Sequence, residues 1–116
     1  MLVNRICEVE GILKKDYQSY ALLMKALGDE NRVQIFEMLS KGERCACEIL
    51  DQLAITQSTL SYHMKLLCDS GLVNGRRDGI WMRYTINPDT MEILKEFFTG
   101  IEASFTGIDS DCCKGK

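Results

Sequence analysis

The stretch of residues 56–88, TQSTLSYHMKLLCDSGLVNGRRDGIWMRYTINP, constrains the fold of this chain more than any other. Its first half has apolar residues at helical spacing, and Thr56 can cap the start of that helix while Gly71 can end it. The second half contains two strand-like runs that flank Asp78-Gly79, a strong signal for a hairpin turn. The pattern therefore predicts a helix that is followed directly by antiparallel strands over 72–76 and 80–86.

Three further helices are predicted before this stretch, because apolar residues recur there at spacings of three and four. The first runs from Tyr17 and stops at Gly28, the second starts after Asp29, and the third lies within ERCACEILDQL, residues 43–53. A last helix is expected to begin at Pro88, since proline suits the first turn of a helix. The predicted fold is mainly α with a small β-hairpin, in the order α-α-α-α-β-β-α, which is a winged helix-turn-helix.

The length of 116 residues suits one domain, and 46% hydrophobic with 27% charged residues is a composition typical of soluble globular proteins. No run approaches the roughly 18 apolar residues that a membrane-spanning helix needs. The N-terminus carries charges where a secretory signal needs an apolar stretch, so we expect a cytoplasmic protein without a membrane partner. We expect an N-terminal segment over 1–16, the winged helix-turn-helix domain over 17–106, and a mobile cysteine-containing tail over 107–116.

The net charge of −3 by itself argues against a nucleic-acid partner, but residues 56–86 contain four basic and two acidic side chains, a local balance of +2. In a winged helix-turn-helix, the second helix presents its N-terminal residues to base edges, and hairpin arginines suit phosphates or the minor groove. The exposed face of the predicted helix carries short or hydrogen-bonding side chains, whereas an ordinary solvated helix more often carries Glu and Lys. We therefore predict contacts with double-stranded DNA from Gln57, Ser58, Thr59, Ser61, Tyr62, His63, Lys65, Arg76, Arg77 and Arg83.

Two of these assignments have a simpler alternative. The hairpin arginines could be ordinary surface residues, and a lone histidine on a helix is often a packed residue. His63 is the only histidine, and no thiol or carboxylate lies near it at the spacing of metal ligands, so a DNA contact is the expected role.

Six cysteines are many for a cytoplasmic chain of this length. A disulfide scaffold is the alternative, but the absence of a signal peptide and the apolar periodicity favour reduced thiols that hold a soft metal ion. Cys45 and Cys47 lie where a helix is predicted to begin, a position that lowers the pKa of a thiol. On a regular helix these side chains point about 200° apart, whereas two sulfurs on one centre must approach within about 4.6 Å. We therefore expect ligation to require a distorted first turn, which would disturb the contact of this helix with the DNA-reading helix.

The stretch ERCACEILDQLAITQSTLSYHMKLLCDSGLVNGRRDGIWMRYTINP resembles the core of the ArsR/SmtB family of metal- and metalloid-responsive repressors, and ALGDENRVQIFEML resembles the preceding helix of that family. The resemblance implies a homodimeric repressor, not an enzyme, which leaves its operator when an inducer binds. It also assigns dimerisation to the first and last helices, whose apolar stripes agree, although both stripes could instead fold back on their own core. The expected interface residues are Tyr20, Leu23, Met24, Met91, Leu94, Phe98 and Ile101.

The resemblance is greatest to arsenite-responsive members, which implies As(III) or Sb(III) as the inducer, with Cys45 and Cys47 among its ligands. Those members often carry a third cysteine three residues after the second, where this chain has Leu50. The third thiolate is expected from Cys112 or Cys113, from either subunit, with Cys7 as the alternative that cadmium- and lead-responsive relatives suggest. A cadmium, lead or zinc inducer, a thiol redox switch and a structural zinc protein remain as alternative functions. Cys68 is expected to be a small core residue.

Overall fold

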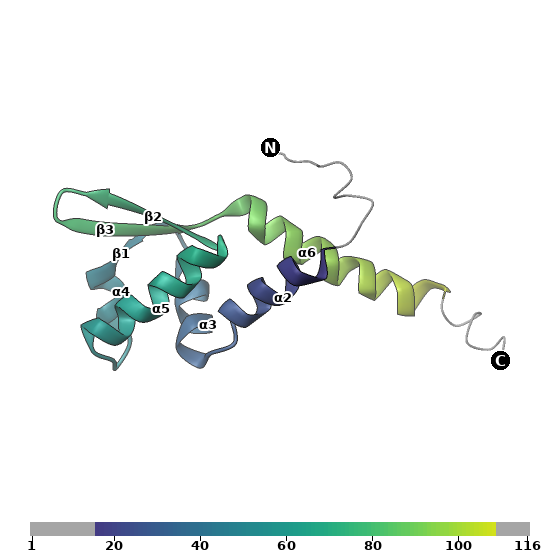
Figure 1. The fold of residues 1–116 in the computed structure, drawn as a ribbon, viewed down its shortest axis with the longest axis horizontal. Helices are drawn as coiled ribbons and strands as arrows, with labels where there is room; N and C mark the ends of the chain where they lie inside the picture. Colours follow the sequence, from purple (N-terminus) through teal and green to yellow (C-terminus); the bar gives the residue numbers. More distant parts are fainter. Residues whose placement is uncertain (1–15, 109–116) are drawn as a thin grey trace.

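The computed structural model describes residues 16–108. The predictions for the segment 1–15 and for Cys7, Cys112 and Cys113 lie outside these residues. The helices are α2 (Tyr17–Ala26), α3 (Glu30–Leu39), α4 (Ala46–Gln52), α5 (Gln57–Ser70) and α6 (Pro88–Ala103), and a π-helical turn η1 (Ser104–Ile108) continues α6. The strands are β1 (Arg44–Cys45), β2 (Val73–Asp78) and β3 (Trp81–Ile86), and Figure 1 shows them at the end of the molecule opposite to the end of α6. The winged helix-turn-helix fold is therefore confirmed.

The ends of the helices follow the capping residues in the sequence. The Asp29 carboxylate accepts hydrogen bonds from the first backbone N–H groups of α3, and the Thr56 hydroxyl accepts one from the Thr59 N–H at 3.2 Å. Helix α5 ends at Gly71, whose φ of +88° lies in the left-handed region where a glycine avoids the strain of a side chain. Pro88 occupies the first turn of α6, as expected.

The three strands form one antiparallel sheet in the order β1-β3-β2. The hairpin between β2 and β3 turns at Gly79 and Ile80, because β2 extends to Asp78 instead of ending at residue 76. Gly79 takes φ +68° in this turn. The sequence did not predict β1, which pairs Arg44 with Tyr84 and Cys45 with Arg83. A strand of two residues has no alternation of apolar and polar residues that a pattern could detect.

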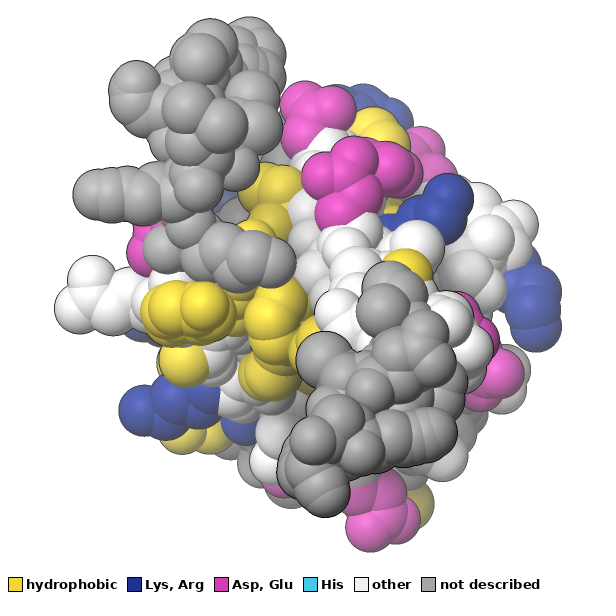
Figure 2. Space-filling model, turned by 90° about the vertical axis from the view of Figure 1, so that its right-hand side faces the viewer, with side chains coloured by type: hydrophobic (Ala, Val, Ile, Leu, Met, Phe, Trp, Pro, Cys, Tyr) yellow, Lys and Arg dark blue, Asp and Glu magenta, His cyan; other side chains and the backbone are white. Residues whose placement is uncertain are grey.

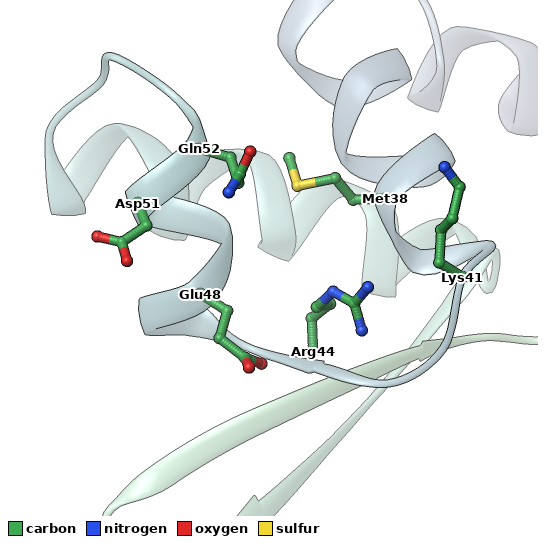
Figure 3. Close-up of a pocket in the computed structure, with 6 residues that line it drawn as sticks. All are labelled: Met38, Lys41, Arg44, Glu48, Asp51 and Gln52. Carbon is green, nitrogen blue, oxygen red and sulfur yellow. The ribbon is translucent and has the colours of Figure 1, made fainter.

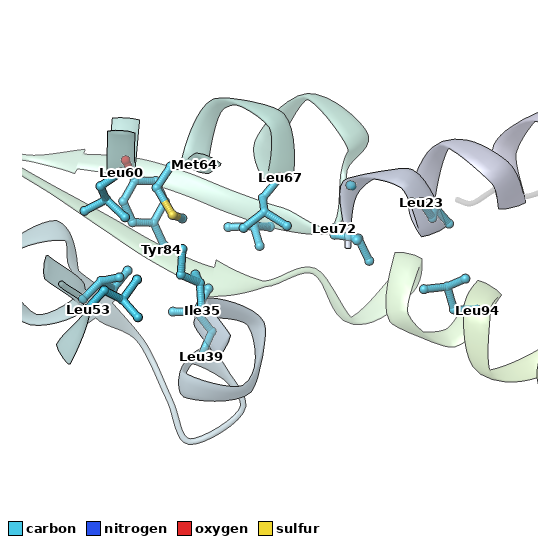
Figure 4. Packing of buried hydrophobic residues seen from close by; sticks show 13 residues of the cluster. Leu23, Ile35, Leu39, Leu53, Leu60, Met64, Leu67, Leu72, Tyr84 and Leu94 are labelled. Carbon is cyan, nitrogen blue, oxygen red and sulfur yellow. The ribbon is translucent and has the colours of Figure 1, made fainter. Parts of the chain in front are cut away.

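The core lies between α5, the sheet and the helices α2, α3 and α4. Leu60, Met64 and Leu67 project inward from α5, as predicted, into the cluster that also contains Tyr84 of β3 (Figure 4). Full burial of a leucine or isoleucine stabilises a fold by about 1.5–3 kcal/mol, so this inner face fixes which side of α5 remains outside. Val33 of α3 lies outside this core and is 51% exposed.

Within residues 16–108, no helix is long and apolar enough to cross a lipid bilayer.

Candidate DNA-binding surface and thiol pair

The outer face of α5 presents the polar side chains that the sequence assigned to DNA. Because the leucines and methionine of this helix point inward, the N-terminal half of α5 leaves five of the predicted residues exposed. Tyr62 is 58% exposed, which leaves its ring and hydroxyl accessible. The hydroxyl of Thr59 accepts a hydrogen bond from the Thr56 hydroxyl at 3.0 Å. Part of the hydrogen-bonding capacity of Thr59 is therefore used in the helix cap. The exposed residues are Gln57, Ser58, Thr59, Ser61 and Tyr62.

Lys65 lies further along the same helix and is exposed. Its ammonium group is 2.9 Å from the Asp69 carboxylate, one turn later, and this contact raises the pKa of Lys65. An exposed pair at this spacing adds little to stability because water screens it, so a phosphate could replace the carboxylate at little cost.

The structure corrects the expected position of His63. Its ring is 5% exposed and faces the interior, where Nδ1 is 2.9 Å from Nη1 of Arg32. Arg32 is itself buried and donates from Nε to the carbonyl of Ala26, at the end of α2. The other ring nitrogen of His63 is 3.8 Å from the Asp29 carboxylate. An arginine has only donors, so Nδ1 of His63 must accept, and the proton of the neutral ring is on Nε2, towards Asp29.

A signal for this burial was present in the sequence. His63 belongs to the series 60, 63, 64 and 67, which has the spacing of an inward-facing helical stripe. The polarity of the side chain suggested a surface position, but a polar group can be buried when a partner such as Arg32 satisfies it.

The hairpin, or wing, carries the three predicted arginines. Arg76 of β2 bonds the Glu43 carboxylate at 2.8 Å, and Arg83 of β3 bonds the Asp78 carboxylate at 2.9 Å, which raises the pKa of Arg83. Arg77 is exposed, and the structure shows no ion pair for it within residues 16–108. Arg77 can therefore meet a phosphate directly, whereas Arg76 and Arg83 must first exchange a weakly held surface carboxylate for the phosphate.

The two cysteines of the ERCACEIL phrase are not arranged as the sequence predicted. Cys45 is the N-cap of α4, with φ −89° and ψ 160°, so its backbone is extended and belongs to β1. The angle of about 200° between helical neighbours therefore does not apply, because Cys45 lies before the first helical residue. The thiol of Cys45 is 6% exposed, whereas Cys47 is exposed. The two cysteines thus flank the first residue of α4, Ala46, and only Cys47 belongs to the regular helix.

The pKa of Cys47 also differs from the expectation. Hydrogen bonding with the Cys45 side chain is the largest effect and raises the pKa of Cys47, and partial loss of hydration adds to it. The carboxylate of Glu48 accepts a hydrogen bond from the Cys45 backbone N–H at 2.8 Å, which lowers the pKa of Glu48. Helix α4 has only 7 residues, so its dipole does not outweigh these neighbours.

These two thiols provide only part of a ligand set. Within residues 16–108, no group of three or more Cys, His, Asp and Glu side chains could hold a metal ion. Cys68 is half-buried on α5, where burial raises its pKa, as expected for a small core residue. Two thiolates fit a soft thiophilic ion, and any third protein ligand would have to come from outside the described residues or from another subunit.

A hollow lies between the end of α3 and α4, beside β1 (Figure 3). It is lined by both cations and anions, so it has no preference for either sign of charge, and we assign it no ligand. The lining residues are Met38, Lys41, Arg44, Glu48, Asp51 and Gln52.

Helices α2 and α6 pack side by side, with the rings of Tyr20 and Phe97 4.4 Å apart, and they leave apolar side chains uncovered. Figure 2 shows hydrophobic side chains gathered on the end of the molecule that α6 forms. Of the predicted interface residues, Leu23 and Leu94 are buried in the subunit's own core, at 4% and 6% exposure, so the structure corrects their expected role. Tyr20 and Met24 are half-buried, and Met91, Phe98 and Ile101 are exposed. The sequence missed four further exposed residues, Tyr17, Leu22, Ile93 and Phe105.

A polar recognition helix, a basic wing and an uncovered apolar face on α2 and α6 define a winged helix-turn-helix regulator that binds DNA. Residues 29–75 match the model of the arsR family of bacterial regulatory proteins. The chain is 35% identical over 91 residues to the arsenical resistance operon repressor of Staphylococcus xylosus, covering 78% of this chain and 88% of that protein. It is 42% identical over 71 residues to the arsenical resistance operon repressor of Staphylococcus aureus, covering 61% of this chain and 68% of that protein.

One solved structure adds the quaternary arrangement of a relative. It is the homodimeric winged helix-turn-helix domain of a possible ArsR-family regulator from Mycobacterium bovis, with a TM-score of 0.62, 26% identity and coverage of 83% of this chain and 87% of that one. The chain belongs to the ArsR family of bacterial regulatory proteins. It is therefore a DNA-binding transcription regulator and not an enzyme, homologous to arsenical resistance repressors.

Proposed function

We propose that this protein is a repressor that binds operator DNA as a homodimer and leaves it when As(III) or Sb(III) binds the thiolates of Cys45 and Cys47. The observation that carries the proposal is the position of the two cysteines at the start of α4, Cys45 as the N-cap and Cys47 in the first turn, in a chain whose relatives include arsenical resistance repressors. Thiolates are soft ligands and bind trivalent arsenic and antimony in preference to hard cations. Cys112 or Cys113 supplies the third thiolate, and Cys7 is the alternative donor.

The DNA contacts come from the exposed face of α5 and from the wing. The polar side chains of α5 read base edges in the major groove, and Arg76, Arg77 and Arg83 hold phosphates or the minor groove. Support comes from the exposure of the α5 residues, Arg76 and Arg77, and from the weakness of the surface ion pairs that hold Arg76 and the half-buried Arg83. His63 is left out of this contact set because its ring is buried.

The homodimer forms through α2 and α6. Support comes from the uncovered apolar side chains on both helices and from the homodimeric relative. An apolar surface of this kind is unusual on a monomer unless a partner covers it. A two-fold symmetric dimer presents two recognition helices to successive turns of the major groove, so we expect an inverted-repeat operator.

The test is a fluorescence-anisotropy titration of the protein bound to a duplex that random-sequence selection has identified as its operator. Arsenite, antimonite, cadmium, lead and zinc are added in turn to the wild type and to the Cys45→Ser/Cys47→Ser variant. Release of the wild type by arsenite or antimonite, with a variant that binds DNA but is not released, supports the proposal. Equal release of both proteins would contradict it.

The same titration separates the alternatives. Release by cadmium, lead or zinc alone identifies a different inducer for the same site. Release by a mild oxidant in the absence of metal, reversed by dithiothreitol, identifies a thiol redox switch. Loss of the helical circular dichroism signal on adding a chelator identifies a structural zinc protein, because a sensor stays folded without its inducer.

A further inference from the structure

The thiol pair is connected to the wing through a strand pairing that joins distant parts of the sequence. Cys45 lies opposite Arg83 in the ladder between β1 and β3, and Arg76 lies opposite the same Arg83 in the ladder between β3 and β2. Residues that pair directly across strands project from the same face of a sheet. One row across the sheet therefore contains a thiol of the pair and two arginines that we assign to DNA.

A side-chain contact connects the same two regions a second time. Glu43 immediately precedes β1, and its carboxylate accepts a hydrogen bond from Nη2 of Arg76 at 2.8 Å. This ion pair spans 33 residues of sequence. Arg76 is thus held by the pairing of β2 with β3 and also by the carboxylate of Glu43, two residues before Cys45.

Helix α4 packs on β1 and β3, so the thiol pair is in direct connection with the sheet. The recognition helix packs on β2 and is also anchored at its middle, because His63 of α5 bonds Arg32 of α3, which bonds the end of α2. A displacement of Cys45 therefore reaches the wing through one strand pairing, whereas it reaches α5 only beyond the wing, at β2, or through the packed core.

We propose that a ligand on the thiol pair weakens DNA binding through the wing, with β1 as the connecting element and Glu43 as the positioning residue for Arg76. This inference rests on the proposed function and names its regulation. Strand β1 pairs only two residues with β3, and an exposed ion pair is weak, so a small movement of Cys45 can separate β1 from β3. The arginines of the wing then lose the position in which they meet phosphates. This route differs from the expected one, in which a distorted cysteine helix acts on the recognition helix.

Phenylarsine oxide tests the route directly, because it bridges two neighbouring thiols whatever the natural inducer is. Two As–S bonds form, and the oxygen leaves as water with the two thiol protons. Amide hydrogen exchange is followed by NMR on the full chain before and after the reaction, and intact mass confirms the attachment. The Cys45→Ser/Cys47→Ser variant is the control for reaction at the other cysteines.

We expect amides on the β1-facing edge of β3 to exchange at least about fivefold faster after bridging, the lower end of the usual range for coupled sites. Amides on the β2-facing edge and in α5 should be unchanged, and the double variant should show no change in β3. Faster exchange in α5 with an unchanged β3 would overturn the proposal. Failure of the reagent to bridge the two thiols would also overturn the proposal, because the proposal requires both thiols to hold one centre.

The role of Glu43 is tested with Glu43→Gln, and Glu37→Gln on α3 is the matched control. Both changes remove one exposed negative charge, but only the first removes a partner of Arg76. Coupling between sites typically changes affinity by about 5- to 150-fold, and we expect Glu43→Gln to reduce the arsenite effect on operator affinity at least about twofold. The same arsenite effect in the two variants would contradict the positioning role. If arsenite does not release even the wild-type protein from operator DNA, the proposed function fails. The phenylarsine oxide experiment still decides whether the thiol pair is coupled to the wing.

Discussion

Nη1 of Arg32 lies 2.9 Å from Nδ1 of His63, and both side chains are buried. The contact joins the start of α3 to the middle of the recognition helix, and the Nε group of Arg32 extends it to the Ala26 carbonyl at the end of α2. A guanidinium that is buried with its donors satisfied has few alternative positions. The network therefore fixes how α5 is seated between α2, which carries part of the apolar face, and α3.

Replacing His63 separates this positioning role from a DNA contact. His63→Leu leaves Nη1 of Arg32 buried without its acceptor, so we expect the free energy of unfolding to fall by about 1–3 kcal/mol. His63→Asn places an amide oxygen near the position of Nδ1 and should recover part of that loss. Urea denaturation of both variants measures the difference. Equal stability of the leucine variant and the wild type would show that the contact does not hold the helix.

Arg77 should contribute to DNA affinity through charge alone. Each protein–phosphate contact adds about 0.9 to the slope of log affinity against log salt concentration, so Arg77→Gln in a homodimer should reduce that slope by about 2. Lys41→Gln is the control, because it also removes one positive charge but lies beside the hollow between α3 and α4 and not on the wing. Anisotropy titrations at several salt concentrations measure the slopes, and a similar reduction for both variants would contradict a specific contact of Arg77.

Two residues of α6 should behave in opposite ways. Phe98 is 54% exposed, so Phe98→Asp should leave the subunit folded but convert the dimer to a monomer and lower operator affinity. Leu94 is 6% exposed, so Leu94→Ala should instead lower the free energy of unfolding by about 2–5 kcal/mol. Sedimentation velocity and urea denaturation distinguish the two effects. A Phe98→Asp variant that remains dimeric would exclude this face as the interface.

The raised pKa of Cys47 predicts the pH dependence of its reactivity. Only the thiolate is nucleophilic, so alkylation of Cys47 should keep accelerating above pH 8.5, where an ordinary cysteine begins to level off. The hydrogen bond of the Cys47 thiol with the Cys45 side chain is the largest cause of the shift, so Cys45→Ala should make Cys47 more reactive at pH 8. Iodoacetamide labelling read by peptide mass spectrometry measures both rates. A slower reaction in the variant would show that Cys45 activates its neighbour.

The lowered pKa of Glu48 predicts acid sensitivity at the same place. A carboxyl group with a depressed pKa stabilises the fold above the pKa it has in the unfolded chain, and this contribution is lost as the pH falls through its folded pKa. The stability of the wild type should therefore fall more steeply on acidification below about pH 4.3 than that of Glu48→Gln. Urea midpoints over this pH range provide the comparison. Parallel curves would mean that the bond to the Cys45 N–H has no effect on stability.

Local patterns in the sequence determined most of the fold. Thr56 and Gly71 bound the recognition helix because a side-chain oxygen at the N-cap and a glycine at the C-terminus act on neighbouring backbone atoms. The spacing of Leu60, Met64 and Leu67 set the inner face of α5, and thereby the outer one. The position of the hairpin was predicted to within two residues at the end of β2, since turn chemistry is also local.

Only the tertiary structure decided how the candidate sites are built. The ladder between Cys45 and Arg83, the ion pair between Glu43 and Arg76 and the burial of His63 all depend on a partner more than thirty residues away. No helical or strand period records such a partner, because periodicity reports which face of an element is apolar and not what that face meets. For the same reason the apolar stripe of α6 was visible in the sequence, but its division between the core and an uncovered face was not. That division arises when α2 and α5 pack, since burial is a property of the assembled chain.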